Sequence, residues 1–578
     1  MSEVRAADSS AFETFQRAAG LIEAGRAAEA LPLLQGLARA APAHPDIRRL
    51  LGIAKRAGGD EAGAEADLKA ALSLSPNSGP TAYALGELLL AQGRAEEVLS
   101  LLSPFLAAPK PDLPLIMLEG EALKSLGRST EALSSFQRAV ATASSSAAAQ
   151  HNLAGVLCDL ERFAEAETAA RTAFTKGLDA PEAWLVLARS LLGQGRDLEA
   201  EAAYRQVLAR RGDHIEAHGE LAQLIWMRTD DVGAAGGDLD RAIARFPDVQ
   251  GLRLKKAELL QTGGDLQGAY EAVAPTTRRA DCEPMMHVIA ARLSLWVDPR
   301  RALFHAADGV AALPDQPVAL STLGEAHLAA GEPSLALTIF ERLYAEAPLD
   351  QHSLGLLATC WRMLDDPRYG ELYDYGSLVR SGTIDVPPGW PDLASYLADL
   401  VPALERLHRF RTHPVGQSIR HGSQTSQRLT LNQDPVIQAF FQAVDGPIRA
   451  YIAALGPGDD PVRSRRTQDY AFNGEWSVRI RESGFHAGHL HPRGWLSSAC
   501  YISLPSAVEA GGREGWLQFG QPGVPTNPHL DPQHFIKPEP GLLALFPSYM
   551  WHGTIPFTGE EARLTIAFDV VPTEGNPR

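Results

Sequence analysis

Three histidines near the C-terminal end of the chain have a spacing that suits metal binding. His489 and His491 are two residues apart, so on an extended segment both side chains leave the same face and can reach one ion. His552 follows the turn at Pro540 and Gly541 and an apolar run, as it would at the mouth of a neighbouring strand. Clusters of imidazoles bind iron, zinc, copper or nickel. Any one of these histidines alone would be read as an ordinary packed or surface side chain.

An arginine downstream adds a second kind of chemistry. Arg563 begins the segment RLTIAFDVV, where Arg563, Thr565 and Ala567 share one face of a strand and the intervening apolar residues share the other. An arginine with a hydroxyl beside it, on a strand that faces a barrel interior, can hold a carboxylate by charge-assisted hydrogen bonds. The segment therefore predicts an anion site close to the histidines.

The elements that must position these residues are short strands. After Tyr470 the sequence changes to alternating runs bounded by turn residues, which predicts an antiparallel sandwich or barrel. The predicted strands are 476–481, 498–503, 516–519, 542–546 and 564–571.

The first two thirds of the chain repeat with a fixed period. A 34-residue step from Gly25 meets glycine at seven of ten positions, and columns of small residues keep the same phase five residues after and seven residues before it. This pattern predicts a helix, a tight turn at the glycine and a second antiparallel helix, with small residues where the backbones approach closely. Residues 229–300 fit the period worst, and Gly236 and Gly237 predict irregular helices there.

The repeat resembles the tetratricopeptide repeat over roughly residues 10–365. The resemblance implies a superhelix whose concave face commonly binds peptide or protein segments. A scaffold that merely spaces domains is the alternative.

Residues 366–469 lose the 34-residue phase and form a predicted helical connector that packs on the catalytic domain. Residues 393–410 and 436–455 read as amphipathic helices, and the polar segment 413–425 as an ordered loop. The prediction is thus of three domains, 1–365, 366–469 and 470–578.

Composition narrows the class of protein. A net charge of −17 argues against nucleic-acid binding, because phosphates would repel a surface with an excess of carboxylates. Four scattered cysteines without a CxxC pair suit a reducing compartment. The N-terminus lacks the apolar run of a signal peptide, and no stretch is apolar enough to span a membrane, so we expect a cytoplasmic protein without a membrane partner.

The histidine pair, the segment PxPGxLxLFPSxxWH that ends at His552, and RLTIAFD from Arg563 together resemble the iron(II)- and 2-oxoglutarate-dependent oxygenases. More narrowly they are similar to the aspartyl/asparaginyl β-hydroxylase group and to bacterial oxygenases often fused to tetratricopeptide repeats. The resemblance implies a double-stranded β-helix (jelly roll), Fe(II) and 2-oxoglutarate. It makes His489 and His552 metal ligands, and Arg563, with Thr565 beside it and Ser477 assisting, the binding site of 2-oxoglutarate.

One departure from the family pattern leaves a question open. Most of the superfamily pairs His-x-Asp/Glu with a distal histidine, whereas this chain has His491 where the carboxylate is usual. His491 is then either a third ligand, which the i, i+2 geometry favours, or a residue that points at substrate. A true His-x-Asp, His529 to Asp531, lies too close to His552 and in a proline-rich loop, so we treat it as coincidental.

The fold class expected is therefore α + β and multidomain: a helical repeat superhelix followed by a jelly-roll oxygenase domain. The expected function is hydroxylation of a C–H bond, most plausibly on an amino-acid side chain of a peptide or protein recruited by the repeats. The alternatives are a hydroxylase of a free amino acid or small metabolite, and a repeat scaffold with an inactive barrel. Cupins also use His-x-His, but they place a glutamate four to five residues later, where this chain has Trp495 and Leu496.

Overall fold

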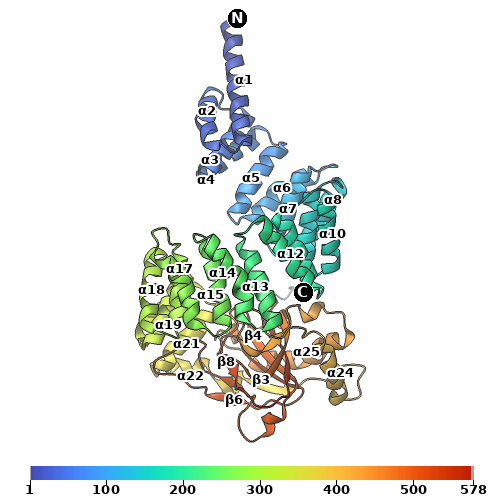
Figure 1. The fold of residues 1–578 in the computed structure, drawn as a ribbon, viewed down its shortest axis with the longest axis vertical. Coiled ribbons are helices and arrows are strands. Elements are labelled where there is room, and N and C mark those ends of the chain that lie inside the picture. Colours follow the sequence, from blue (N-terminus) through green and yellow to red (C-terminus); the bar gives the residue numbers. More distant parts are fainter. Residues whose placement is uncertain (1, 574–578) are drawn as a thin grey trace. The chain divides into compact units, whose positions relative to one another are not determined.

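The structure, a computed structural model, describes the backbone of residues 2–573 and the side chains from residue 11 onward. The chain divides into two compact units, residues 1–210 and 211–578 (Figure 1). Within the described residues, no helix combines the length and apolar character needed to cross a bilayer.

The first unit consists of antiparallel helix pairs, as the 34-residue period predicts. Gly93 and Gly127 have φ of 75° and 72° at the turns between paired helices, and Glu161 takes the same left-handed conformation with φ 56° in a repeat that lacks the glycine. Gly120 lies where two helices touch, since a Cβ there would be 2.5 Å from Phe136 Cζ. The helices of this unit are α1 (Ser2–Glu23), α2 (Ala27–Ala40), α3 (Pro45–Ala57), α4 (Glu61–Leu74), α5 (Gly79–Ala91), α6 (Ala95–Leu106), α7 (Leu113–Ser125), α8 (Ser129–Thr142), α9 (Ala147–Asp159), α10 (Phe163–Thr175), α11 (Pro181–Gly193) and α12 (Asp197–Arg210).

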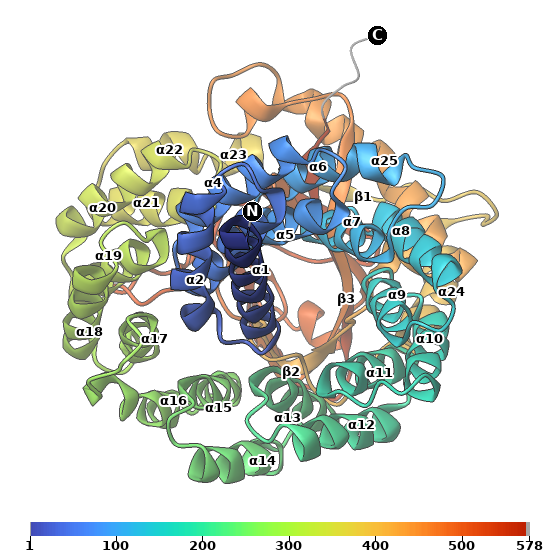
Figure 2. The same cartoon turned by 90° about the horizontal axis from the view of Figure 1, so that it is seen from above.

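The second unit begins with further helix pairs, which follow one another along a curve in Figure 2. They are α13 (Ile215–Thr229), α14 (Val232–Arg245), α15 (Gln250–Thr262), α16 (Leu266–Val273), η1 (Thr276–Arg278), α17 (Met285–Ser294), α18 (Pro299–Ala312), α19 (Pro317–Ala330), α20 (Pro333–Glu346), α21 (Gln351–Met363), α22 (Arg368–Leu372) and α23 (Tyr375–Leu378).

The irregularity expected between residues 229 and 300 is only partly present. The prediction for Gly236 and Gly237 is wrong, because α14 runs through both as a regular helix. The reason is packing: Gly236 is buried, and a Cβ there would lie 2.3 Å from Lys256 Nζ and 3.5 Å from Leu259 Cδ2 on α15. The irregular part follows it, where the eight-residue α16 gives way to the 3₁₀ turn η1.

The connector supplies helices and strands to the C-terminal sheet. The expected helices are present as α24 (Leu393–Glu405) and α25 (Pro435–Leu455), and the 3₁₀ turns η2 (Leu429–Leu431) and η3 (Arg463–Arg465) lie nearby. Two strands were not expected, β1 (Arg380–Thr383) and β2 (Ile419–Gln424). β2 forms within the polar segment that reads as a loop, because its backbone pairs with β3.

The C-terminal region consists of two antiparallel sheets, with strand orders β1-β7-β4-β9-β3-β2 and β6-β5-β8. All five predicted strands are present. The strands are β3 (Tyr470–His486), β4 (Leu496–Ser503), β5 (Leu517–Phe519), β6 (His534–Ile536), β7 (Leu542–Pro547), β8 (His552–Thr554) and β9 (Arg563–Pro572), with the 3₁₀ turn η4 (Ser506–Glu509) between β4 and β5. The expected order of helical repeats and then an antiparallel β region is therefore confirmed.

The last repeat helices and the sheets share one hydrophobic core. It extends from Leu320 on α19 through α21, α24 and α25 to the strands of the larger sheet. At Gly355 on α21 the approach is so close that a Cβ would lie 2.4 Å from Leu490 Cδ2, between the two histidines of the pair. The indole N–H of Trp551 donates to Gly355 O at 3.1 Å and to Thr359 Oγ1 at 3.0 Å. The repeat end thus holds the segments before both His491 and His552.

A second attachment joins the connector to α13 and α15. Met227 O accepts the backbone N–H groups of Arg411 and Thr412 at 2.9 and 3.0 Å, and Trp226 Nε1 donates to His413 O at 2.9 Å. The N–H of Val415 donates to the side chain of Gln223 at 3.2 Å. The segment that precedes β2 is therefore fixed on repeat helices.

Candidate metal centre

The histidine pair and His552 meet through their backbones. His489 lies just after β3 and forms an isolated antiparallel bridge with His552, the first residue of β8. Each donates its backbone N–H to the carbonyl of the other at 2.9 Å. Because β3 belongs to the larger sheet and β8 to the smaller, this bridge connects the two sheets and sets the position of both side chains.

The side chains of His489, His491 and His552 converge. One ring nitrogen of each lies within 4.8 Å of the others, and the ring centroids are 4.3 to 5.2 Å apart. Among the residues that the structure describes, these three are the one group of His, Cys, Asp or Glu with the spacing to hold a metal ion. The structure therefore brings together the three residues that the sequence predicts as ligands.

Each ring is oriented by an acceptor at Nδ1. His489 donates to Ala487 O at 2.9 Å and His552 donates to Met550 O at 2.9 Å. His491 donates to the carboxylate of Asp569, with both oxygens 2.7 Å from Nδ1. A histidine that donates from Nδ1 keeps a lone pair on Nε2, which is the usual arrangement of metal-binding histidines. The three Nε2 atoms are thus the donors left for an ion.

Burial keeps two of these rings in the form that binds metal. It lowers the pKa of His489 to about 3, and it lowers the pKa of His552 well below its ordinary value, with the neighbouring imidazoles adding to both shifts. Because a protonated imidazole cannot bind a metal, both rings are in the binding form at neutral pH. The donor set, three imidazoles, fits ferrous iron.

Arg563 lies in the same pocket as the histidines and is almost fully buried, with 2% of its surface exposed. It donates to Gly515 O at 3.1 Å and to Thr554 Oγ1 at 3.4 Å, whereas its Nε has no partner. Within the described part of the chain, it makes no ion pair with a carboxylate. Burial lowers its pKa, and a buried guanidinium without a counter-charge is costly, so this geometry fits an anionic ligand.

Tyr501 adds a polar group that the sequence analysis missed. Its side chain lines the pocket, its hydroxyl is buried without a hydrogen-bond partner, and Arg563 Cζ is 5.8 Å from its ring centroid. Tyr501 pairs across strands β4 and β9 with Thr565, which also lines the pocket. Only strand pairing reveals Tyr501, because nothing in its own sequence neighbourhood marks it. Arg563, Tyr501 and Thr565 together form the polar end of the pocket.

Ser477 is not brought into this pocket. In the β3–β9 pairing it lies opposite Ile566, whereas its neighbours Trp476 and Val478 lie opposite Ala567 and Thr565 and line the pocket. The Ser477 side chain is fully buried on the other face of the sheet. Ser477 is therefore not among the residues that we propose to bind 2-oxoglutarate.

On that other face Ser477 belongs to a buried hydrogen-bond chain. Its hydroxyl donates to Thr565 O at 3.2 Å, so the contact with His408 at 3.0 Å is a donation from His408 Nε2. His408 Nδ1 must then accept from the Ser423 hydroxyl at 2.9 Å. His408 is thus neutral and ties β2 to β3 behind the metal centre.

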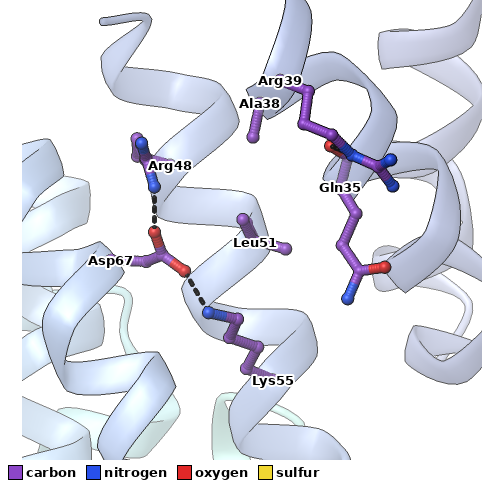
Figure 3. Close-up of a pocket in the computed structure, with 7 residues that line it drawn as sticks. All are labelled: Gln35, Ala38, Arg39, Arg48, Leu51, Lys55 and Asp67. Atoms are coloured by element: carbon purple, nitrogen blue, oxygen red, sulfur yellow. Dashed lines mark hydrogen bonds and ion pairs between the residues drawn. The ribbon is translucent and has the colours of Figure 1, made fainter. Parts of the chain in front are cut away.

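Two other possibilities do not form a comparable site. His529 and Asp531 are exposed, with 62% and 87% of their side chains accessible, in agreement with a coincidental motif. A hollow in the first unit, lined by α2, α3 and α4, contains one carboxylate, Asp67, which pairs with Arg48 at 2.6 Å and Lys55 at 2.7 Å (Figure 3). That carboxylate is already neutralised by its neighbours.

The comparisons with known proteins agree with this geometry. The family model described as "Putative 2OG-Fe(II) oxygenase" matches residues 474–569, which include all three histidines and Arg563. The tetratricopeptide repeat model matches residues 15–79, 117–173, 152–215 and 185–249. Both resemblances seen in the sequence are thereby confirmed. No curated protein matches the chain.

Two of the solved structures that are similar to parts of this chain are tetratricopeptide repeat proteins. A thermophilic tetratricopeptide repeat protein of Thermus thermophilus is 23% identical, with 31% of this chain and 98% of that chain covered and a TM-score of 0.28. A tetratricopeptide repeat protein from Parabacteroides merdae is 15% identical, with 48% and 97% covered and a TM-score of 0.32.

The buried His408 predicts a specific pH dependence of stability. Burial lowers its pKa to about 4 in the folded protein, whereas an unfolded histidine titrates near pH 6.5. The unfolded state therefore binds more protons between these values, and stability falls as the pH decreases from about 6.5 to about 4. We expect His408→Gln to remove about 2 kcal/mol of the stability lost between pH 7 and pH 5, as measured by urea unfolding at the two pH values.

The matched control is His529→Gln, which replaces an exposed histidine of the same unit. It should retain the pH dependence of the wild type. If His408→Gln loses as much stability between the two pH values as the wild type does, the buried neutral histidine is not the cause.

Proposed function

We propose that this chain, in which tetratricopeptide repeats precede a domain that matches the "Putative 2OG-Fe(II) oxygenase" family, is an iron(II)- and 2-oxoglutarate-dependent dioxygenase. The observation that supports this most is the pairing, in one pocket, of three oriented imidazoles with a buried guanidinium that lacks a counter-charge. The first suits a ferrous ion, and the second suits the distal carboxylate of the cosubstrate.

The roles follow from the contacts of each residue. His489, His491 and His552 would hold the ion through Nε2, with their Nδ1 protons fixed by Ala487 O, Asp569 and Met550 O. We propose His491 as a third ligand because Asp569 orients it as the two carbonyls orient the others.

At the other end of the pocket, Arg563 and the Tyr501 hydroxyl would donate to the distal carboxylate, with Thr565 beside them. Trp476 stacks on His491 and Phe546 packs against His552 in a T-shaped arrangement, with ring centroids 5.6 and 4.6 Å apart, and both would exclude water from the ligands.

Bound iron and 2-oxoglutarate would supply the oxidation: dioxygen places one oxygen atom in a C–H bond of the substrate and the other in succinate, as 2-oxoglutarate loses carbon dioxide. The chain holds the ion, fixes the cosubstrate and keeps the pocket dry. We propose that the double-stranded β-helix expected from the sequence is formed by the two antiparallel sheets that meet at His489 and His552.

We further propose that the substrate is an amino-acid side chain of a peptide or protein. Tetratricopeptide repeats are in general modules that bind protein partners. In the second unit the repeats hold the loops around the pocket directly: Arg362 on α21 donates to Gly520 O and Asp531 O, both at 2.7 Å, and Asn527 donates to Leu328 O on α19 at 3.2 Å. A partner bound to these helices would lie close to the pocket loops.

We assign residues 1–365 to partner binding, 366–469 to support of the sheet and 470–578 to catalysis. We also place the protein in the cytoplasm, which is supported by four cysteines that are all free thiols.

The catalytic proposal predicts 2-oxoglutarate turnover that depends on the pocket. Wild-type protein with Fe(II) should release succinate from 2-oxoglutarate, and His552→Ala should reduce the rate by more than about 100-fold because it removes a ligand. Arg563→Lys should raise the apparent Kd for 2-oxoglutarate by about tenfold or more, because a lysine cannot form the same forked contact. Both expectations are tested by measuring succinate release by chromatography as a function of the 2-oxoglutarate concentration. Equal turnover in all three proteins would end the oxygenase proposal.

The third-ligand proposal predicts changes in metal affinity. Asp569→Asn should weaken Mn(II) binding by about 10- to 100-fold, because the amide cannot hold the His491 ring as a carboxylate does. His491→Ala should weaken it at least as much. Asp531→Asn is the matched control, an exposed carboxylate in the same unit that should bind Mn(II) like the wild type. If affinity and turnover survive His491→Ala, two histidines hold the ion.

The protein-substrate proposal predicts a need for the first unit. Full-length enzyme, protein lacking residues 1–210, and His552→Ala are incubated with cell extract and 2-oxoglutarate, and peptides that gain one oxygen atom are identified by mass spectrometry. We expect such peptides with the full chain and far fewer with the truncated protein, although succinate release without substrate should be retained. Equal labelling by the truncated protein would contradict a role for residues 1–210. Oxygen found only in free amino acids or metabolites would favour a small-molecule hydroxylase.

A further inference from the structure

A fourth histidine lines the same pocket without belonging to the metal-binding group. His486 is the last residue of β3, and its ring is stacked on His489 with centroids 5.5 Å apart and an interplanar angle of 28°. It is absent from the set of three whose ring nitrogens converge. Its position on the wall beside His489 therefore requires a separate explanation.

A bulge in β3 brings His486 to this position. Between the register pairs Gly422↔Ile480 and Arg420↔Phe485, β3 contains three residues more than β2. Gly484 is needed within the bulge, because a Cβ there would lie 2.4 Å from Ile480 Cγ2 and 2.8 Å from Arg420 O. The bulge returns the chain to the sheet so that His486 enters the pocket.

The backbone of His486 is connected by hydrogen bonds to the polar end of the pocket, where Arg563 lies. Its N–H donates to Thr554 Oγ1 at 2.8 Å, and the same oxygen accepts from Arg563 Nη2 at 3.4 Å. One hydroxyl therefore fixes His486 relative to Arg563, while ring stacking fixes it relative to His489. His486 lies on the wall that joins the two ends of the pocket.

The side chain has one ring nitrogen occupied and one available. His486 Nδ1 lies 3.0 Å from Ser418 Oγ, and the backbone carbonyl of Ser418 accepts the N–H of Ala487 at 3.0 Å. In the described residues, Nε2 of His486 has no protein partner. When the Ser418 hydroxyl donates to Nδ1, Nε2 carries the proton and is a donor on the pocket wall. A partly buried donor of this kind requires a ligand or a water as acceptor.

We propose that His486, on the pocket wall between the histidine trio and Arg563, is a positioning residue for 2-oxoglutarate, to one of whose carboxylate oxygens Nε2 donates a hydrogen bond. The inference rests on the proposed function, since it names a further contact of the same cosubstrate. The ligand chemistry is that of a dicarboxylate with a 2-keto group, whose hydrogen-bond acceptor oxygens lie at its two ends, separated by two methylene groups. Ser418 sets the tautomer of His486, and Thr554 sets its distance from Arg563.

The test measures binding rather than turnover. His486→Phe keeps a ring in place but removes the donor, and His486→Gln keeps an N–H donor. Mn(II) affinity is measured by electron paramagnetic resonance, and 2-oxoglutarate affinity by calorimetry on the Mn(II)-loaded full chain. We expect His486→Phe to bind Mn(II) like the wild type and to bind 2-oxoglutarate about tenfold more weakly or worse, with His486→Gln recovering part of the loss.

The matched control is His534→Phe, which changes a partly buried histidine of strand β6 that stacks on Tyr375 outside the pocket. It should bind both ligands normally. Unchanged 2-oxoglutarate affinity in His486→Phe would overturn the inference, as would loss of Mn(II) binding, which would make His486 a ligand or a structural support. Equal losses in the Phe and Gln variants would also overturn it, since the donor would then be irrelevant. If the wild type itself does not bind 2-oxoglutarate, the proposed function fails instead.

Discussion

The structure of the pocket depends on one constraint: three imidazole rings must each point one ring nitrogen at the same place. Close, buried imidazoles cannot be protonated together without repulsion and loss of hydration, and this lowers the pKa of His489 and His552. Neutral rings can still rotate, so each needs an acceptor for its Nδ1 proton. Two backbone carbonyls and the Asp569 carboxylate provide these acceptors, and the reciprocal hydrogen bonds between His489 and His552 hold the two strands in register.

The repeats of the second unit are part of the support for this site. Leu490, between the two histidines of the pair, packs against Gly355, and Trp551, beside His552, donates to α21. On another side, α13 holds the segment that leads to Ser418, which in turn contacts His486. These contacts give a physical reason why a change at the repeat helices would be felt in the pocket. They also mean that a cut near residue 365 would divide a continuous hydrophobic core.

The sequence alone was sufficient for the residues whose position in the pocket follows from their own segment of the chain. His489, His491, His552, Arg563 and the five main strands could be predicted from spacing and alternation. Ser477 could not be placed in the same way, because β3 is buried on both faces and alternation does not then tell which face meets the pocket. Tyr501, His486 and His408 depend on pairing between strands or on contacts between distant segments. Asp569 lies within the recognised segment RLTIAFD, but its role appears only when its oxygens are found beside His491.

The position of Asp569 accounts for the departure of this chain from the usual His-x-Asp/Glu pattern. In the proposed function, a carboxylate ligand would contribute one negative charge to a site that also holds Fe(II), the 2-oxoglutarate dianion and a guanidinium. This chain has His491 at that position, and a buried carboxylate lies directly behind it at 2.7 Å from Nδ1. In the proposed loaded pocket, the charge of Fe(II) cancels that of the 2-oxoglutarate dianion. The charge of Arg563, +1, is balanced by that of Asp569, −1. The negative charge of the site is retained, one side chain further from the proposed metal than a carboxylate ligand would place it. A third histidine is therefore an electrostatically reasonable replacement for the carboxylate ligand.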